Sequence, residues 1–581
     1  MSYKDQAEEL ALLVMELQAL VAKEKGGAQS ESEPQPAGKG GFSPMRIPWN
    51  ATKIGRVVSV KGATVIALLE APREDQLAAY IAEDPDALQI GALVKMRTQD
   101  TVVFGMICGL SIPSQSFDHQ QPRIVELELV GEARISGEDT PMVFHRGVSL
   151  RPTLGDNVYS TTQEDLKRVY AKPEAASARV GTICQDRSLP AFVAVDDLLG
   201  KHFAVLGTTG SGKSCAVTTM LRSILDQYRD GHILLLDLHN EYGHAFRDCA
   251  EVLGPGEFKL PYWLLNFDEL AQTLIGQRDD RQEDLSILKD AVAHAKRAYN
   301  GGDDGAYPYQ PDAPVPYRMS DVLQRIDQSL GRLDKPTDSV PYLRLRERID
   351  ALQADRRFDF MFQEGLTVKD TMADVLSRLF RIPVRGKPIT ILDLSEIPSD
   401  IMNVVISLIG RLTFDFALWA ERRVPILLVC EEAHRYAGEN TDAGFEPTKR
   451  MLSKIAREGR KYGVSLCLVS QRPSELPVGI LSQCNTIFAM RMSNQKDQEF
   501  VRGTLSDSGL GLMESLPSLR TGEAIAVGEG IPVPVRFCFD ELPADSRPLS
   551  GTACFSGAWQ NGTHAEDFVS DVVERWRRQG R

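Results

Sequence analysis

The stretch GTTGSGKS, residues 207–214, constrains the fold of this chain more than any other feature. It follows the apolar run FAVL and precedes a segment expected to be helical from about Lys213. It fits the pattern G-x-x-x-x-G-K-[ST], whose glycines let backbone N–H groups surround phosphates. Lys213 is expected to reach the β and γ oxygens of a nucleotide, and the Ser214 hydroxyl to ligate Mg²⁺. The predicted phosphate-binding residues are Gly207, Thr208, Thr209, Gly210, Ser211, Gly212, Lys213 and Ser214.

Composition places the chain among globular proteins of more than one domain. Its 581 residues are too many for one ordinary core, so two or three domains are expected. The composition, 43% apolar and 25% charged, is typical of soluble proteins. The net charge of −14 argues against a surface coated in nucleic acid, but not against a narrow basic channel that grips a strand.

Targeting and redox features indicate a cytosolic protein. No apolar run is expected to reach the roughly eighteen residues that cross a bilayer, and MSYKDQAEEL lacks the apolar core of a signal peptide. The nine cysteines are scattered without a CxxC pair. Because Cys430 and Cys467 lie inside apolar runs, buried free thiols are expected rather than disulfides or zinc ligands.

The N-terminal region is predicted to be a helix followed by a linker. Residues 8–23 place apolar side chains on one helical stripe, so a short amphipathic helix is expected within 1–25. Residues 26–48 are rich in Gly, Ser, Pro and Glu, which is typical of a flexible linker. The helix packs either on its own body or on a partner or neighbouring subunit.

Two further domains and a tail follow from the pattern of apolar runs. Short β-rich runs at 54–69, 93–110 and 123–135 predict a small β-barrel over 49–175. From 176 to 545 apolar strands alternate with helices, which predicts an α/β core with a parallel sheet covered on both faces. Charge patterns suited to helices fill about 257–388, so a helical insertion outside the sheet is expected there. A tail with a helix is expected over 546–581.

Acidic and polar residues follow the apolar strands of the α/β core. PILLVCEE ends in Glu431 and Glu432, on the side of a parallel sheet where ligands bind. The first carboxylate is expected to hold the Mg²⁺ shell and the second to polarise the attacking water. Gln471 follows VSLCLVS and is expected to contact the γ-phosphate. Asp237 is expected either to orient water or metal or only to cap the following turn, with Glu241 facing the same cleft.

A basic helix is predicted between the acidic strand and Gln471. KRMLSKIAREGRKYG, residues 449–463, carries six basic side chains, for which a solvated face is the usual explanation. In a ring ATPase one arginine must reach the γ-phosphate held by a neighbouring subunit. Arg457 is the first candidate for that role and Arg460 the second.

These motifs together resemble one family. KHFAVLGTTGSGKS, LLLDLHNEY, LLVCEEAH and KIAREGRKYGVSLCLVSQRPSELP, behind a β-barrel, resemble the HerA-type hexameric DNA translocases of the HerA/FtsK group of P-loop ATPases, over roughly residues 50–545. The resemblance implies a RecA-like core, a HAS-type barrel, a ring of six subunits and ATP-driven movement along double-stranded DNA. It also implies a nuclease or other effector docked on the barrel side.

The resemblance also assigns residues. The catalytic acid falls on Glu432, the helix arginine on Arg457 and the γ-phosphate-sensing glutamine on Gln471. Lys201 stands where some relatives carry an arginine that acts between subunits, and lysine cannot form the same planar fork. Glu431 stands where many relatives have aspartate, which keeps the charge of a Mg²⁺ ligand.

The sequence is compatible with more than one function. The chain is either a motor that pulls duplex DNA or a hexameric ATP-binding scaffold that arrays an effector with little translocation. A secretion or conjugation ATPase is a third possibility, disfavoured by the expected lack of a membrane span. The resemblance does not separate DNA end processing from phage defence. In the tail, THAEDFVSDVVERWR predicts a helix that packs on a neighbouring subunit or on its own.

Overall fold

The structure is a computed structural model of the whole chain, and it divides into two compact units. Unit 1 comprises 1–194 and 486–538, and unit 2 comprises 195–485 and 539–581. The residues that the structure describes are 52–69, 88–98, 100–112, 123–134, 143–254, 256–257, 259–276, 281–299, 310, 312–331, 339–363, 369–397, 399–439, 446–505, 509–549, 555–560 and 567–578. The predicted N-terminal helix and linker lie outside the described residues.

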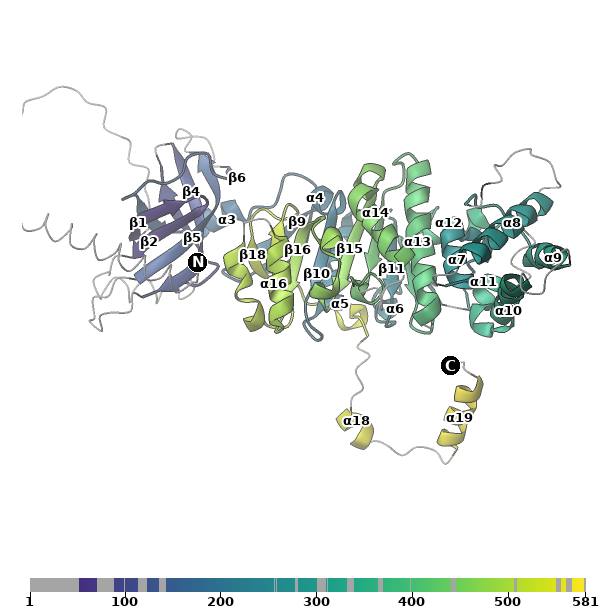
Figure 1. The fold of residues 1–581 in the computed structure, drawn as a ribbon. Coiled ribbons are helices and arrows are strands. Elements are labelled where there is room, and N and C mark those ends of the chain that lie inside the picture. Colours follow the sequence, from purple (N-terminus) through teal and green to yellow (C-terminus); the bar gives the residue numbers. More distant parts are fainter. Residues whose placement is uncertain are drawn as a thin grey trace, which may run out of the picture. The chain divides into compact units, whose positions relative to one another are not determined.

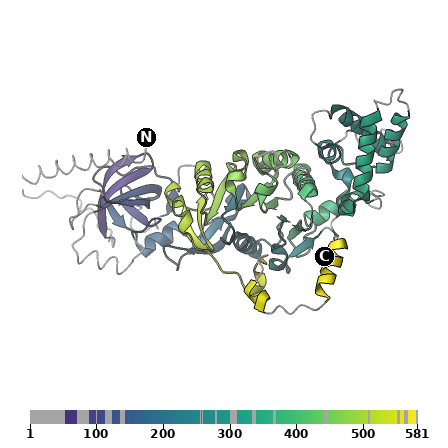
Figure 2. The same ribbon diagram turned by 60° about the horizontal axis from the view of Figure 1, so that its bottom comes forward.

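The predicted barrel is present in unit 1 (Figures 1 and 2). Its strands are β1 (Lys53–Lys61), β2 (Thr64–Leu69), β3 (Leu93–Arg97), β4 (Thr101–Ser111), β5 (Arg123–Arg134) and β7 (Asn157–Ser160). They follow the order β2-β1-β7-β3-β4-β5, and antiparallel pairing of β2 with β5 closes the ring. β6 (Phe144–Arg146) adds to β5. Alternating side chains fill the interior, including Val65, Ala67, Met96, Val103 and Ile107.

Unit 1 also contains strands from both ends of the α/β region. β16 (Cys484–Met490), β17 (Glu523–Gly528), β18 (Val535–Phe539), β8 (Ser177–Ile183) and β9 (Pro190–Ala194) lie in that order, with antiparallel β16–β17, β17–β18 and β8–β9 pairs. Unit 1 also contains the helices α3 (Gln163–Val169), α16 (Gln495–Thr504) and α17 (Leu510–Met513). A capping box at Thr162 starts α3, and Lys95 of the barrel forms a 2.6 Å ion pair with Asp165 in it.

The sheet of unit 2 is parallel, as the unbroken apolar runs predict. Its strands are β12 (Ala250–Leu253), β13 (Ile389–Asp393), β11 (Ile233–Asp237), β14 (Ile426–Cys430), β15 (Val464–Ser470) and β10 (His202–Leu206), in that order. The segment 250–253 was not expected to be part of the sheet. This expectation was wrong, because β12 pairs in parallel with β13. The RecA-like P-loop fold class with a preceding barrel is confirmed.

The helices of unit 2 pack along this sheet. They include α4 (Val195–Leu199), α5 (Lys213–Gln227), α6 (Tyr242–Ala245), α13 (Ser399–Trp419), α14 (Glu446–Tyr462) and α15 (Val478–Leu481). On α14, the residues Met451, Leu452, Ile455 and Ala456 form a buried stripe opposite its basic face, which explains a helix in so basic a segment. Thr448 Oγ1 donates 2.8 Å to the Asn403 carbonyl of α13, which fixes the two helices side by side.

The helical insertion lies between β12 and β13. Its helices are α7 (Phe267–Leu274), α8 (Gln282–Tyr299), α9 (Met319–Leu330), α10 (Val340–Ala354), α11 (Asp359–Phe362) and α12 (Met372–Leu379), and both ribbon views show α8, α9 and α10 gathered together. The aromatic residues Tyr262, Tyr317 and Phe362 form part of its core.

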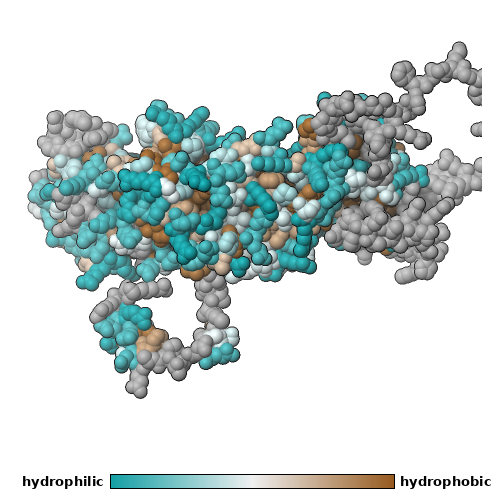
Figure 3. Space-filling view, turned by 180° about the vertical axis from the view of Figure 1, so that it is seen from behind, coloured by the Kyte–Doolittle hydropathy of each residue, from teal (hydrophilic) through white to brown (hydrophobic). Residues whose placement is uncertain are grey.

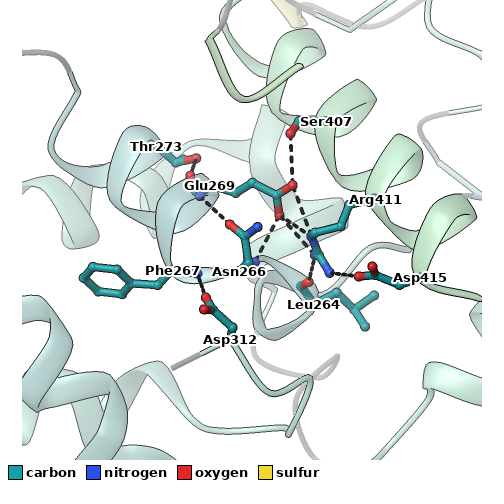
Figure 4. A network of polar contacts seen from close by, with 9 residues as sticks. All are labelled: Leu264, Asn266, Phe267, Glu269, Thr273, Asp312, Ser407, Arg411 and Asp415. Carbon is teal, nitrogen blue, oxygen red and sulfur yellow. Dashed lines mark hydrogen bonds and ion pairs between the residues drawn. The ribbon is translucent and has the colours of Figure 1, made fainter. Parts of the chain in front are cut away.

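A buried polar network joins the start of the insertion to α13 (Figure 4). The carboxylate of Glu269 on α7 accepts from Arg411 Nη2 at 3.1 Å and from Ser407 Oγ at 2.9 Å. It also caps its own helix by accepting from the Asn266 N–H at 3.0 Å. Because a buried charge is costly unless it is paired and hydrogen-bonded, these contacts fix α7 on α13.

The apolar character of α13 corrects one expectation. Its segment Ile401–Trp419 is long and apolar enough to cross a membrane by length and composition, whereas no such run was expected. In the structure 72% of that segment is buried inside the protein, as in the core helix of a globular domain. The described cysteines are free, with Cys430 and Cys467 buried, as predicted. Figure 3 shows a mostly hydrophilic face with smaller hydrophobic patches.

Two helices of the tail are described. They are α18 (Phe555–Gln560) and α19 (Phe568–Arg578), and the predicted capping residues at 563 and 566 lie outside the described residues. The apolar side chains Val569 and Trp576 of α19 are 68% and 76% exposed. The helix exists as predicted, and its docking on a neighbouring subunit stays a prediction.

Candidate functional site

Neighbouring parallel strands of unit 2 bring the predicted site residues to one edge of the sheet. The strands β11, β14, β15 and β10 are consecutive in the sheet order. Asp237 ends β11, Glu431 follows β14, Gln471 follows β15 and Gly207 follows β10. Because the carboxyl ends of parallel strands meet at the same edge, where ligands bind in such sheets, these residues form one candidate site.

The loop between β10 and α5 has the backbone that phosphate binding requires. Gly210 and Gly212 have φ values of 73° and 99°, which favour glycine, and no atom lies within 4 Å of the position that a Cβ on Gly210 would take. The loop leads directly into the N-terminus of α5, where unpaired N–H groups and the helix dipole attract anions. The loop therefore fits a polyphosphate.

Lys213 is positioned inside this loop. Its side chain is mostly buried, and Nζ donates a 3.3 Å hydrogen bond to the Thr208 carbonyl. Burial lowers the pKa of Lys213, while the nearby carboxylates, Glu432 first, act in the opposite direction. The Ser211 hydroxyl is buried without a hydrogen-bond partner in the described chain. An anionic ligand beside Nζ would stabilise the charged form of Lys213 and so offset the effect of burial.

Ser214, the next residue, is tied to the turn after β11. Its hydroxyl donates a 2.6 Å hydrogen bond to Glu241 Oε2. The sequence places Glu241 in the cleft, but the motif assigns it no role. The structure adds it to the site as the carboxylate that holds the predicted Mg²⁺-ligating hydroxyl.

Asp237 has the turn-capping contacts that were one of its two expected roles. Its Oδ1 accepts from the N–H groups of His239 at 3.2 Å and Glu241 at 3.1 Å, and Oδ2 accepts from Tyr242 N–H at 2.9 Å. The carboxylate is fully buried. These contacts fix the turn that carries Glu241, so Asp237 positions another site residue, and a direct role with water or metal stays a prediction.

Glu431 lies in a buried and negatively charged environment. One carboxylate oxygen accepts from the Leu238 N–H at 3.2 Å. Burial raises the pKa of Glu431 well above its ordinary value, and the neighbouring carboxylates of Asp237 and Glu241 raise it further. A cation would favour the charged form of this carboxylate.

Glu432 has an unusual backbone and a free buried oxygen. Its φ and ψ are 46° and 44°, the left-handed region that non-glycine residues seldom adopt and that clusters at functional sites. Within the described chain, Oε2 is buried without a hydrogen-bond partner. Nδ1 of His434 lies 3.3 Å from it, and burial lowers the pKa of that imidazole, which favours its neutral form. Glu432 therefore retains a free acceptor for water.

Gln471 connects Glu432 to the phosphate loop. Its Nε2 donates to Glu432 Oε1, and its Oε1 accepts from the Thr209 hydroxyl. Thr209 was predicted only as a loop residue, and no sequence signal marks it as the partner of a residue 262 positions away. A phosphate that contacts either Thr209 or Gln471 would change the hydrogen bonding of Glu432.

The candidate trans-acting residues lie apart from these contacts. Arg457 and Arg460 are exposed on α14, and the described chain provides no hydrogen bond or ion pair for the Arg457 side chain. Arg457 Nη2 lies 3.9 Å from the position that a Cβ would take on Gly479. Lys201 Nζ lies 3.8 Å from Asp197 of its own chain. Among the three, Arg457 and Arg460 are the side chains presented to solvent.

The residues present fit a nucleotide-bound magnesium ion. Mg²⁺ prefers oxygen ligands and is usually held by one or two carboxylates together with substrate phosphates. Ser214, Glu241 and Glu431 supply a hydroxyl and two carboxylates beside the loop. No cluster of three or more His, Cys, Asp or Glu suited to a metal is found among the described residues.

Comparison with known proteins finds similarity to helicases named HerA. Residues 178–413 match the family described as Helicase HerA, central domain. The DNA double-strand break repair helicase HerA of Pyrococcus furiosus is 27% identical over 497 residues, 78% of this chain and 83% of that protein. The HerA of Saccharolobus solfataricus is 24% identical over 523 residues, covering 86% and 96% of the two chains.

A solved structure is also similar. VirB4 of Thermoanaerobacter pseudethanolicus aligns with a TM-score of 0.45 and 14% identity, over 65% of this chain and 99% of that one. The family match covers the phosphate loop and its helix, and the HerA relatives extend the similarity over most of the chain. The match over residues 178–413 and the relatives that align over most of the chain therefore support a HerA-type helicase.

Proposed function

We propose that this chain is an ATP-hydrolysing motor that moves double-stranded DNA. The observation that carries the proposal is the hydrogen-bonded series Thr209, Gln471 and Glu432, which links a phosphate loop to a buried carboxylate with a free oxygen. The relatives named DNA double-strand break repair helicase HerA support DNA as the substrate.

The site residues divide the chemistry among them. The loop and Lys213 bind the β and γ phosphates. Ser214 and Glu431, with Glu241, would hold a Mg²⁺ ion, which would offset the phosphate charge. Glu432 Oε2 accepts a hydrogen bond from the attacking water and takes its proton. Gln471 couples the state of the γ-phosphate to the catalytic carboxylate, because the same side chain contacts Thr209 of the loop and Glu432.

Assembly and partners extend this proposal. A ring of six subunits would place Arg457 of one subunit, with Arg460 as the alternative, at the phosphates of the next. The exposure of both side chains supports this arrangement. The barrel over 49–175, of HAS type, would dock a nuclease or other effector, and the ATPase domain would span 176–545 with the tail at 546–581. The motor would act in the cytoplasm, in DNA end processing or in phage defence.

Steady-state hydrolysis of ATP with and without linear duplex DNA tests the proposal. Wild type should hydrolyse ATP with Mg²⁺, and duplex DNA should raise the rate several-fold. Lys213→Ala should abolish hydrolysis, because the loop loses its fixed charge at the phosphates. Lys172→Ala is the matched control, since Lys172 is an exposed lysine of unit 1. Hydrolysis that survives Lys213→Ala, or that duplex DNA leaves unchanged, contradicts the proposal.

A further inference from the structure

Unit 1 contains a cavity that the proposed function does not use. Its volume is about 410 Å³, within the range of roughly 300–1,000 Å³ typical of small-molecule sites. It is lined by the segment 89–92, by the end of β8 and the residues after it, and by β17 and β18 with the turn before them. All these elements belong to unit 1.

The lining carries an excess of positive charge. Arg187, Arg520 and Arg536 face one acid, Glu523, so two positive charges are in excess. Glu523 is already engaged, because Oε2 accepts from Arg536 Nη2 at 2.8 Å and from the Arg520 N–H at 3.0 Å. The side chains of Arg187 and Arg520 make no hydrogen bond or ion pair within the described chain and are exposed. The cavity therefore presents two exposed guanidinium groups, and its lining carries two more positive charges than negative ones.

Two buried polar atoms of the lining also lack partners. Gln185 Oε1, an acceptor, and Arg536 Nε, a donor, are buried without a hydrogen bond in the described residues. An unsatisfied buried polar atom is destabilising, and native proteins usually satisfy such atoms. One donor and one acceptor on a bound molecule would satisfy this pair.

The remaining wall is apolar. Ala92, Ile183 and Val535 line it and are almost fully buried. Cys184 also lines the cavity, and burial raises the pKa of its thiol to about 11, so it is neutral and serves as a small apolar group. A ligand that suits this wall needs an apolar or planar surface as well as polar edges.

We propose that this cavity binds a nucleoside monophosphate. Its phosphate carries nearly two negative charges at neutral pH, which match the guanidinium groups of Arg187 and Arg520. A base supplies a planar face for the apolar wall and an edge with both a donor and an acceptor for Gln185 and Arg536. Inorganic phosphate lacks the base, and a triphosphate brings more charge than the lining offsets.

Calorimetric titration of the full-length chain with AMP, GMP, CMP and UMP, each up to 2 mM, tests the proposal. Lys213→Ala serves as the background, because it disables the phosphate loop as a competing site. At least one nucleotide should bind, and Arg520→Ala should weaken its binding ten-fold or more, since a charge-assisted hydrogen bond contributes about 1.5–3 kcal/mol. Arg423→Ala removes the same charge from an exposed pair with Glu421 and should leave binding unchanged.

Two further measurements test whether the nucleotide base contributes to binding. Gln185→Leu keeps a similar volume and should weaken nucleotide binding several-fold without changing the thermal unfolding midpoint. Inorganic phosphate at equal concentration should fail to displace the nucleotide. The proposal is wrong if none of the four nucleotides binds, if Arg520→Ala behaves like Arg423→Ala, if phosphate alone competes fully, or if binding seen in wild type disappears in Lys213→Ala.

Discussion

The Ser214 hydroxyl donates a 2.6 Å hydrogen bond to Glu241 Oε2, which joins the first turn of α5 to the turn after β11. That turn is fixed in place by Asp237, whose carboxylate accepts three backbone N–H groups. The carboxylate of Glu241 is thus held beside the hydroxyl that the phosphate-loop motif assigns to Mg²⁺. It orients Ser214 and adds negative charge where the cation is expected.

Glu241→Gln should therefore weaken the response to Mg²⁺. Loss of one negative oxygen next to a ligand typically costs 10–100-fold in metal affinity, so the Mg²⁺ concentration for half-maximal ATP hydrolysis should rise about 10-fold. A magnesium titration at fixed ATP measures this value. Glu421→Gln changes an exposed glutamate and serves as control. If Glu241→Gln has the same magnesium dependence as the wild type, Glu241 does not contribute to magnesium binding.

Glu432→Gln should bind ATP but stop turnover. The amide cannot accept the proton of the attacking water, and loss of a general base typically lowers rates by about 10²–10⁴-fold. Nucleotide affinity and kcat should be measured on the same preparation, with the exposed Glu439 changed to glutamine as control. Wild-type turnover in Glu432→Gln shows that another group is the base.

Arg457→Ala should leave nucleotide binding intact and lower turnover by about 10³-fold or more, if the guanidinium acts on a neighbouring subunit. Mixing Arg457→Ala with Lys213→Ala subunits should recover part of the activity, because some interfaces then combine an intact loop with an intact arginine. Arg450→Ala, on the same helix, should retain activity. Mixed assemblies that are verified by mass and remain inactive argue against action between subunits.

The elements of this site were predictable because each motif follows its own strand. The loop after β10, the acids after β14 and Gln471 after β15 follow from local sequence and the rule for parallel strands. Their contacts were not predictable, since Thr209 and Gln471 are 262 residues apart and the left-handed backbone of Glu432 has no sequence signal. β12 was missed because AEVL is short and contains a glutamate, so it lacks the unbroken apolar run of the other strands.

The contacts that anchor the insertion on α13 could not be predicted for the same reason. Glu269 and Arg411 lie 142 residues apart, so nothing local pairs them (Figure 4). Arg411→Met should lower the free energy of unfolding by about 3 kcal/mol, because it leaves the buried Glu269 carboxylate without its cation. Urea denaturation of the full chain measures the change.

A matched exposed pair provides the control for this prediction. Arg325→Met breaks an exposed pair with Asp290 and should cost less than about 1 kcal/mol. Replacing Glu269 with leucine in the Arg411→Met background should recover part of the stability, since the unpaired charge is then removed. Equal destabilisation by Arg411→Met and Arg325→Met means that the buried network does not anchor the insertion.

Displacement of a fluorescent third strand from a linear duplex tests the motor function most directly. A translocating protein removes the third strand as it passes, at a delay that grows with the length of duplex between the entry end and the triplex. For a motor, displacement should require ATP, should disappear in Glu432→Gln and should take longer as the duplex before the triplex lengthens. ATP hydrolysis by the wild type without displacement at any duplex length would contradict it and favour an ATP-binding scaffold.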